Sequence, residues 1–286
     1  MDRAETFNSY RPLLFSIAYR MLGSAMDAED LVQETFTRWQ STTANIESPK
    51  AFLAAIITRL CIDQLRSAKT QREDYIGPWL PEPIMTDSTT NPDSALADSL
   101  SIAFLVVLES LSPVERAVFL LREVFDYGYA EIARIVDKSE PNCRQMVKRA
   151  KEHIAARRPR FTVRPEEHDR LVVQFGQVCA NGDLEGLLAL LADDITAYSD
   201  GGGKVVAARN PIVGADRVAR FILGILRKMP VGAVLGLGII NGQTAIITQV
   251  GAQPYNVLAF DIDTGRIRRI FNILNPEKLK KIAILD

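Results

Sequence analysis

The side chains that most often carry catalysis or bind metal ions are sparse in this chain of 286 residues. Its three cysteines, Cys61, Cys143 and Cys179, lie far apart with no CxxC pair, and His153 and His168 are the only histidines. A zinc site, a Ser-His-Asp triad or a Cys-His pair needs more of these residues, or a closer grouping. This scarcity argues against most hydrolase chemistry. Taken with the rest of the sequence, it predicts a protein with no metal, no cofactor and no enzymatic activity.

A second group of chemically informative side chains lies at residues 138 to 160, where eight basic residues accompany two acidic ones. The apolar residues of this segment fall on one helical stripe. The opposite face carries Asn142, Arg144, Gln145, Lys148 and Arg149. Arg and Gln present forked donors that suit guanine and adenine edges, whereas Lys148 and Arg149 suit phosphates. This face is typical of a helix that reads the major groove of DNA.

The elements around this face have helix-turn-helix spacing. The pattern predicts a short helix over 129–136, a tight turn over 137–139 and a longer helix over 140–157. Before them, Ser112-Pro113-Val114-Glu115 has the form of a capping box that opens a helix running through Arg122. The segment therefore predicts a small helical domain that presents the 140–157 helix.

The first 72 residues also have a helical pattern. Two apolar stripes, from Leu14 to Leu22 and from Ala28 to Trp39, are separated by Gly23, and a third helix begins with Ser48 as N-cap. The third helix becomes basic near its end, because residues 59–72 hold four basic side chains and one acidic side chain. Three amphipathic helices predict a small bundle.

A proline-rich segment, 73–97, separates the two helical parts and contains prolines at positions 78, 81, 83 and 92. Proline removes a backbone donor and disfavours helix in the preceding residue, so we expect an extended linker. Trp79 and Leu80 are unusually apolar for a free linker. We expect them to pack against the C-terminal part of the chain.

The composition changes after Pro159 and Pro165. Helical patterns near 171–178, 184–191 and 218–226 are joined and followed by strand-like runs at 195–199, 204–208, 233–240, 244–250, 255–260 and 266–273. Asn241-Gly242 and Asp263-Thr264-Gly265 are hairpin signals. The order predicts an α+β domain with a curved antiparallel sheet.

The two helical parts resemble regions 2 and 4 of the extracytoplasmic-function sigma factors of bacterial RNA polymerase. DAEDLVQETFTRW at 27–39 resembles region 2.2, and SPKAFLAAIITRLCIDQLRS at 48–67 resembles regions 2.3 and 2.4. Residues 111–154 resemble region 4, although Asp137-Lys138 replaces the usual glycine of the turn. The resemblance covers roughly residues 5 to 158, and each match is a pattern of many residues.

Three further motifs resemble the sigma-factor group that carries a fused C-terminal SnoaL-like domain: WLPEP in the linker, DGGGK at 200–204 and NPEKL at 275–279. NPEKL has Glu277 where the group has Asp. The resemblance implies two all-α domains and an α+β cone-shaped domain of the SnoaL and nuclear-transport-factor type. Such cones have an apolar interior, and the aromatic residues that either line it or pack in the ordinary core are Phe175, Tyr198, Phe221, Tyr255, Phe260 and Phe271. The expected division is a region 2 domain at 1–72, the linker at 73–97, a region 4 domain at 98–160 and a SnoaL-like regulatory domain at 166–286.

The resemblance also implies roles for particular residues. The helix at 27–39 is expected to bind the β′ clamp helices of core polymerase through Asp30, Gln33, Glu34 and Thr37. The −10 promoter element is assigned to Asn45, Ile46, Arg59, Asp63, Gln64, Arg66 and Ser67, and the −35 element to the 142–149 face. Regulation within the chain is assigned to Trp79, Leu80, Pro81, Asp200, Gly201, Gly202, Gly203, Lys204, Asn275, Pro276, Glu277, Lys278 and Leu279. Asp200 is expected to be exposed, because it lies in a glycine-rich turn.

The sequence favours a factor that directs promoter-specific transcription initiation together with core polymerase, modulated by its own C-terminal domain. One alternative is a one-component regulator with a ligand-binding cone, which leaves residues 5–72 without a role. A second alternative is an isomerase or cyclase with an appended binding module. The net charge of −1 excludes only a protein that coats DNA indiscriminately. We expect a cytoplasmic protein without a membrane segment. The sequence does not decide whether the cone-shaped domain binds a small molecule.

Overall fold

The computed structural model describes residues 3–43, 46–72, 75–86, 99–157 and 163–283. By its internal contacts the chain divides into two compact units, one formed by 1–74 and 107–158 and the other by 75–106 and 159–286. The boundary between them falls inside helix α5 (Ile102–Leu108). Linker residues thus belong with the C-terminal unit, whereas the division into family regions given above stays a prediction.

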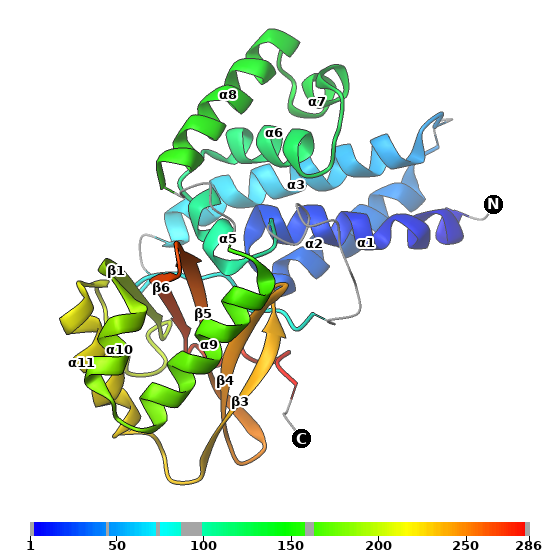
Figure 1. The fold of residues 1–286 in the computed structure, drawn as a ribbon. Helices are drawn as coiled ribbons and strands as arrows, with labels where there is room; N and C mark the ends of the chain where they lie inside the picture. The colour runs from blue at the N-terminus through cyan, green and yellow to red at the C-terminus, as the bar shows by residue number, and fades with distance from the viewer. Residues whose placement is uncertain (1–2, 44–45, 73–74, 87–98, 158–162, 284–286) are drawn as a thin grey trace. The chain divides into compact units, whose positions relative to one another are not determined.

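The first unit begins with three helices, α1 (Arg3–Leu22), α2 (Ala25–Ser41) and α3 (Pro49–Arg72) (Figure 1). Gly23 adopts a φ of 68° between α1 and α2, a conformation that glycine reaches without steric cost. The side chain of Ser24 then accepts a hydrogen bond from the N–H of Asp27 and caps α2. The bundle buries Leu14, Ile17, Met21, Val32 and Trp39 among its apolar residues, as the two stripes predicted.

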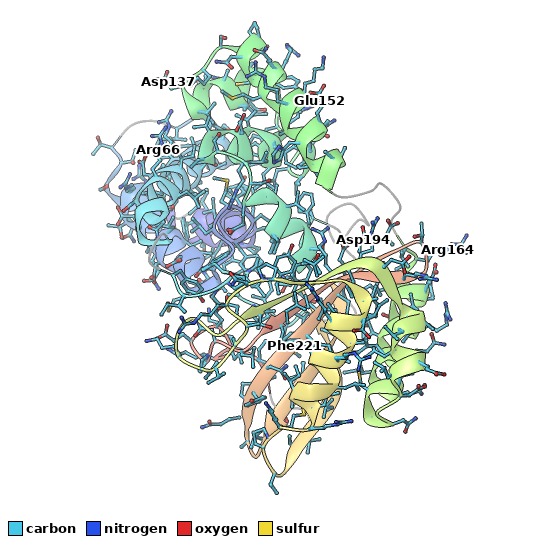
Figure 2. All side chains as sticks on the ribbon, turned by 90° about the vertical axis from the view of Figure 1, so that its left-hand side faces the viewer. Arg66, Asp137, Glu152, Arg164, Asp194 and Phe221 are labelled. Atoms are coloured by element: carbon cyan, nitrogen blue, oxygen red, sulfur yellow. The ribbon has the colours of Figure 1, made fainter. Side chains whose placement is uncertain are left out.

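Helices α6 (Pro113–Glu123), α7 (Tyr129–Val136) and α8 (Glu140–Arg157) complete this unit. The predicted capping box is confirmed, because Ser112 and Glu115 exchange hydrogen bonds at the start of α6. The α7 and α8 boundaries agree with the predicted helix-turn-helix. Asp137, labelled in Figure 2, makes the turn with a φ of 53°, a left-handed conformation that Asp tolerates better than most residues.

The second unit is built on a six-stranded sheet with the order β2-β1-β6-β5-β4-β3. Its strands are β1 (Leu191–Asp200), β2 (Ile212–Val213), β3 (Ala233–Ile240), β4 (Gln243–Val250), β5 (Gln253–Asp263) and β6 (Arg266–Ile273). The consecutive strands β3 to β6 form antiparallel pairs through short turns. The expectation of an antiparallel sheet was wrong in one place, because β1 and β6 are parallel. After β1 and β2 the chain crosses to the far edge of the sheet at β3, and the meander from β3 to β6 then brings β6 beside β1.

Helices α9 (Pro165–Ala180), α10 (Leu184–Leu190) and α11 (Ala215–Leu226) cover one face of this sheet (Figure 1). The core between them contains Phe175 and Phe260, whose ring centroids are 4.9 Å apart. Phe221, labelled on α11 in Figure 2, packs at its edge. The other aromatic predictions were wrong: Tyr198 and Phe271 stack on the opposite face, and Tyr255 is exposed, because neighbouring residues of a strand alternate between faces.

The opposite face of the sheet packs against linker and tail residues of the same unit. Leu80, Ile102 and Ala103 meet Ile247, Val257 and Phe271 of the sheet, together with Leu279 and Ile282 of the C-terminal tail. Met85 forms a single antiparallel bridge with Ile240 at the edge of β3. The described part of the linker, residues 75–86, therefore follows the sheet as an extended segment, as its prolines predicted.

The strand predicted at 204–208 was wrong. This segment is a loop, and Val205 and Val206 are exposed, Val206 almost completely. Gly202 and Gly203 have φ values of 57° and 71°, which turn the chain sharply after β1. Alternation of apolar residues indicated a strand, but the preceding turn places the segment away from the sheet. Between this turn and α11, only the two residues of β2 pair with β1.

Candidate functional site

Helix α8 carries a polar face above a buried stripe. Cys143, Val147 and Ala150 are buried, while Met146 and Ile154 are half-buried. All five residues assigned to the −35 element lie exposed on the other side of the helix: Asn142, Arg144, Gln145, Lys148 and Arg149. The side chain of Ser139 accepts a hydrogen bond from the N–H of Asn142 and helps to start the helix beside the tight turn.

Two of these side chains are partly ordered by neighbours on the same unit. The guanidinium of Arg144 lies 2.9 Å from the carboxylate of Glu140 and 4.4 Å from the centroid of the Tyr129 ring. The ammonium of Lys148 is 4.0 Å from the carboxylate of Glu152. Exposed pairs of this kind contribute at most about 1 kcal/mol, so a stronger anionic partner can replace the carboxylates. The side chains of this face are thus partly ordered but remain able to bind an anionic ligand.

The polar side of α2 is exposed as predicted. Asp30, Gln33, Glu34 and Thr37 all face away from the bundle, opposite the buried Val32 and Trp39. Glu34 pairs with Arg38 at 2.8 Å, and the Thr37 hydroxyl donates to the carbonyl of Gln33. The helix therefore offers an acidic and polar surface whose members are one turn apart.

The residues assigned to the −10 element do not form one open surface. Arg59 is engaged within the first unit, where its guanidinium donates to the carbonyls of Arg134 and Ile135 at 2.8 and 2.9 Å. These carbonyls belong to the last turn of α7, whose free acceptors and dipole favour a cation. Asp63 and Arg66 pair with each other at 3.5 Å.

The remaining members of the −10 group have varied surroundings. Ser67 is exposed, whereas Gln64 and Ile46 are half-buried, and Asn45 lies outside the described residues. Sequence reasoning missed the Arg59 contact, since its partners are backbone atoms 75 and 76 residues away. A basic residue in an amphipathic helix gives no signal for such a contact.

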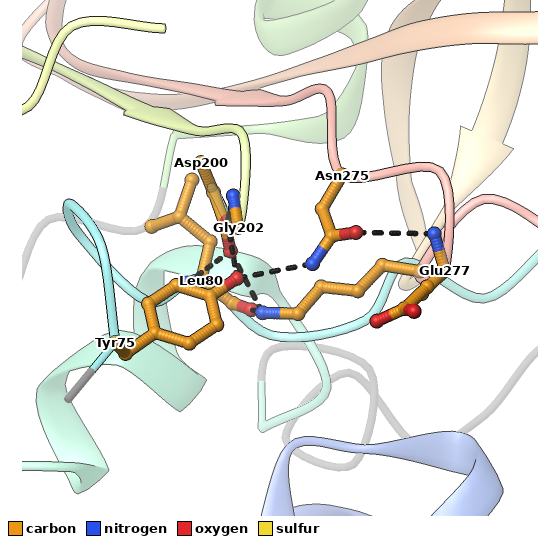
Figure 3. A network of polar contacts seen from close by, with 7 residues as sticks. Tyr75, Leu80, Asp200, Gly202, Asn275 and Glu277 are labelled. Atoms are coloured by element: carbon orange, nitrogen blue, oxygen red, sulfur yellow. Dashed lines mark hydrogen bonds and ion pairs between the residues drawn. The ribbon is translucent and has the colours of Figure 1, made fainter. Parts of the chain in front are cut away.

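Asp200 is the centre of the polar network drawn in Figure 3. Its side chain is completely buried, and four donors reach it. Tyr75 Oη and Gly202 N donate to Oδ1 at 2.5 and 3.0 Å, and Leu80 N and Lys278 Nζ donate to Oδ2 at 2.8 and 2.7 Å. The expectation of an exposed Asp200 was wrong, because the linker and the C-terminal tail close over the end of β1.

Lys278 connects the same carboxylate to the aromatic side chains of the linker. Its ammonium lies 4.1 Å from the centroid of the Trp79 ring and 5.2 Å from that of Tyr75, and it also donates to the carbonyl of Leu80. Cations over aromatic rings contribute about 0.5 to 2 kcal/mol, more when water is excluded. The expected packing of Leu80 is confirmed, since its side chain is 1% exposed; Trp79 is half-buried.

Asn275 fixes the tail against the turn. Its backbone N–H donates to the carbonyl of Asp200, its side-chain amide donates to Tyr75 Oη at 3.1 Å, and its side-chain carbonyl accepts from Glu277 N. The assigned motif residues are therefore brought together: Pro81 and Leu279 are buried, while Lys204 and Glu277 form an exposed pair at 3.4 Å.

Tyr75 is a member of this network that sequence reasoning missed. Burial and the hydrogen bond to the Asp200 carboxylate raise the pKa of Tyr75 well above its ordinary value, so its hydroxyl stays a donor. The available signal was an aromatic residue close to Trp79 in a segment rich in proline.

Comparison with known proteins identifies the helical parts. The family model for Sigma-70 region 2 matches residues 6–71, and the model for Sigma-70 region 4 matches residues 101–154. The chain is 35% identical to the ECF RNA polymerase sigma factor SigJ of Mycobacterium tuberculosis over 95% of its own length and 91% of that protein. The chain belongs to the extracytoplasmic-function sigma factors of RNA polymerase.

The likeness of this sigma factor to its relatives extends over the C-terminal domain. A protein named as a probable ECF RNA polymerase sigma factor, SigI of Mycobacterium tuberculosis, is 33% identical and covers 96% of this chain and 93% of its own. The crystal structure of Mycobacterium tuberculosis SigJ superposes with a TM-score of 0.78 at 31% identity, covering 97% of this chain and 98% of that one. The predicted architecture, two helical sigma domains followed by an α+β domain, is confirmed.

The region 2 match also accounts for the N-terminal helices that a one-component regulator left without a role. Among the described residues, no helix is long and apolar enough to cross a membrane. In the same part of the chain, no three His, Cys, Asp or Glu side chains are grouped closely enough to hold a metal ion.

Proposed function

We propose that this sigma factor directs core RNA polymerase to promoters by reading the −35 element with α8 and the −10 element with α3 and the segment before it. The observation that carries the proposal is the exposed polar face of α8, seated on a buried stripe inside a complete helix-turn-helix. A fixed helix with forked donors at its outer face is the arrangement that reads base edges in the major groove.

The two kinds of donor on α8 have different tasks in this proposal. Arg144, Asn142 and Gln145 can each make paired hydrogen bonds to a base edge, which discriminates between base pairs by about 1 to 3 kcal/mol. Lys148 and Arg149 neutralise phosphates and so contribute affinity without sequence preference. Arg144 exchanges the Glu140 carboxylate for the base when DNA arrives.

The α2 surface supplies the proposed contact with core polymerase. Asp30 and Glu34 provide negative charge, with Gln33 and Thr37 beside them on the exposed side of the helix. An acidic and polar face suits a basic partner, and we assign the β′ clamp helices to that role. Regions 2 and 4 bind DNA together only when the polymerase fixes their separation, so the free chain should bind promoters weakly.

The C-terminal domain is proposed to modulate this activity by holding the linker. The linker joins the two DNA-binding regions, and residues 75–86 are fastened to the sheet through Asp200, Lys278 and the burial of Leu80. A fastened linker limits how far the regions can separate. The Arg59 contact with the end of α7 also limits promoter binding, because it engages a side chain that is assigned to the −10 element.

The proposal is tested by binding of the full holoenzyme to a promoter fragment at fixed salt. Arg144→Ala should weaken binding about tenfold and relax the preference for the −35 sequence, because a base contact of about 1 to 3 kcal/mol is lost. Arg220→Ala is the matched control, since Arg220 is another exposed helical arginine that pairs with the carboxylate four residues earlier, at 2.9 Å. Equal affinity and equal sequence preference in all three proteins would refute the assignment of α8.

A further inference from the structure

A cavity of 410 Å³ lies in the second unit beside the glycine-rich turn after β1. Its walls come from two parts of the sequence. Ile76 and Gly77 of the linker form one, and the turn and loop after β1 form the other, through Ser199, Gly201, Gly203 and residues 204–209. Asp200 is not among the lining residues, so the cavity is distinct from the network of Figure 3. Its volume lies in the range of small-molecule sites, about 300 to 1,000 Å³.

The charged side chains of the cavity are both cations, Lys204 and Arg209. Lys204 is already paired with Glu277, at 3.4 Å. Arg209 is exposed and forms no ion pair within the described part of the chain. A guanidinium binds a carboxylate through two parallel hydrogen bonds, so Arg209 is the natural anchor for an acidic ligand.

The rest of the lining is small and largely apolar. Val205, Val206, Ala207 and Ala208 form one wall, and Val205 and Val206 are 39% and 99% exposed. Adjacent exposed valines on a loop are unfavourable in water, and a ligand with a short hydrocarbon chain would cover them. Ser199, which is 2% exposed, also lines the cavity.

The linker side of the cavity lies close to its other wall. A methyl group placed on Gly77 would lie 3.8 Å from Cα of Arg209, and one placed on Gly203 would lie 3.0 Å from the side chain of Ile76. The cavity is therefore complete only while the linker is docked on the C-terminal domain.

We propose that this cavity binds a small organic acid, with its carboxylate on Arg209 and its short aliphatic chain against Val205, Val206 and Ile76, and that binding favours the docked linker. A ligand that requires Ile76 and Gly77 in place has higher affinity for the docked state and shifts the population toward it. The regulatory half of this inference rests on the proposed sigma function, whereas the binding half does not.

Binding can be tested on the full chain by backbone amide NMR, with hexanoate as the probe. Hexanamide serves as the neutral match and inorganic phosphate as an anion without a hydrocarbon chain. At about 10 mM, where a millimolar site is largely occupied, hexanoate should give saturable shifts for amides of 201–209 and 76–77. Hexanamide and phosphate should bind at least tenfold more weakly. Absence of saturable shifts with hexanoate, or equal affinity for hexanamide, would overturn the proposal.

Arg209→Gln identifies the anchor. It should raise the dissociation constant for hexanoate at least tenfold, whereas Arg227→Gln, which changes an exposed arginine outside the cavity, should leave it unaltered. Arg209 is exposed, so the variant should fold, and an unchanged pattern of amide shifts outside 201–209 would establish that. Equal hexanoate binding by both variants would contradict the assigned anchor.

The coupling is tested by cleavage of the docked linker with chymotrypsin at Tyr75 and Trp79. At a hexanoate concentration ten times its dissociation constant, cleavage of the wild-type chain should slow about tenfold, because binding removes the undocked population. Arg209→Gln should show no slowing at that concentration. An unchanged wild-type cleavage rate would refute the coupling. Promoter-dependent transcription by wild type without added acid separates this failure from a failure of the proposed sigma function.

Discussion

Replacing Asp200 by Asn is the sharpest perturbation of linker docking, because one carboxylate receives donors from the linker, the turn and the tail. Asn keeps the size of the side chain but removes the negative charge and presents an NH₂ group to neighbours that are themselves donors. The charge of Lys278, whose side chain is 12% exposed, would then no longer be balanced by a carboxylate.

The free-energy cost of Asp200→Asn for linker docking follows from this buried ion pair. Removing one member of a buried ion pair costs about 3 to 5 kcal/mol, since the other charge stays buried and uncompensated. A loss of about 3 kcal/mol raises the undocked fraction roughly 150-fold, at about 1.4 kcal/mol for each factor of ten. Pairing the change with Lys278→Met should restore part of the lost docking free energy, because the buried positive charge is then absent as well.

The assay is limited chymotrypsin cleavage of the full-length chain at Tyr75 and Trp79, followed with time under native conditions. When opening is fast relative to cleavage, the rate reports the undocked population. Asp200→Asn should therefore increase the cleavage rate by about two orders of magnitude. Asp216→Asn, which alters an exposed carboxylate paired with Arg220, should not change it. Equal rates for the wild type and Asp200→Asn would refute the docking argument.

Three further perturbations probe other parts of the chain. Asp137→Gly should stabilise the first unit by up to about 1 kcal/mol in urea unfolding, because glycine adopts the left-handed turn without strain, and a lower midpoint would count against that geometry. Arg59→Ala should speed amide hydrogen exchange in α7, and unchanged exchange over 129–136 would mean that its two hydrogen bonds to the end of α7 contribute little. Burial lowers the pKa of His168, so the unfolded chain takes up a proton first as the pH falls below about 6.5. The thermal unfolding midpoint should therefore decrease as the pH is lowered below about 6.5, and His168→Gln should make this decrease less steep. Parallel plots of midpoint against pH for the two proteins would exclude His168 as the cause.

Local signals in the sequence were sufficient for the helical parts. The boundaries of α7 and α8, the Ser112–Glu115 capping box and the break at Gly23 each depend on residues within one or two turns of each other. The polar face of α8 followed in the same way, because 3.6-residue periodicity alone separates its exposed from its buried positions.

The predictions that failed concern contacts between residues distant in sequence. The donors that bury Asp200 come from Tyr75 and Leu80, 120 or more positions earlier, and from Lys278 in the tail. Composition suggested an exposed turn because nothing near Asp200 in sequence supplies those donors.

The prediction of an all-antiparallel sheet failed for the same reason. The parallel pairing of β1 with β6 closes a loop of more than sixty residues, and no nearby residue specifies it. The missing strand at 204–208 has a local cause, since the glycines before it redirect a segment whose composition favours a strand.

The central claim, that this chain directs polymerase to promoters, is tested most directly by run-off transcription with core RNA polymerase, the full-length chain and a library of genomic fragments. The account predicts transcripts that core polymerase alone does not make, starting downstream of fragments that share a −10 and a −35 sequence. It also predicts that Arg144→Ala reduces these transcripts while Arg220→Ala does not. Failure of the wild-type chain to produce any transcript beyond those of the core enzyme, on every template, would contradict the claim.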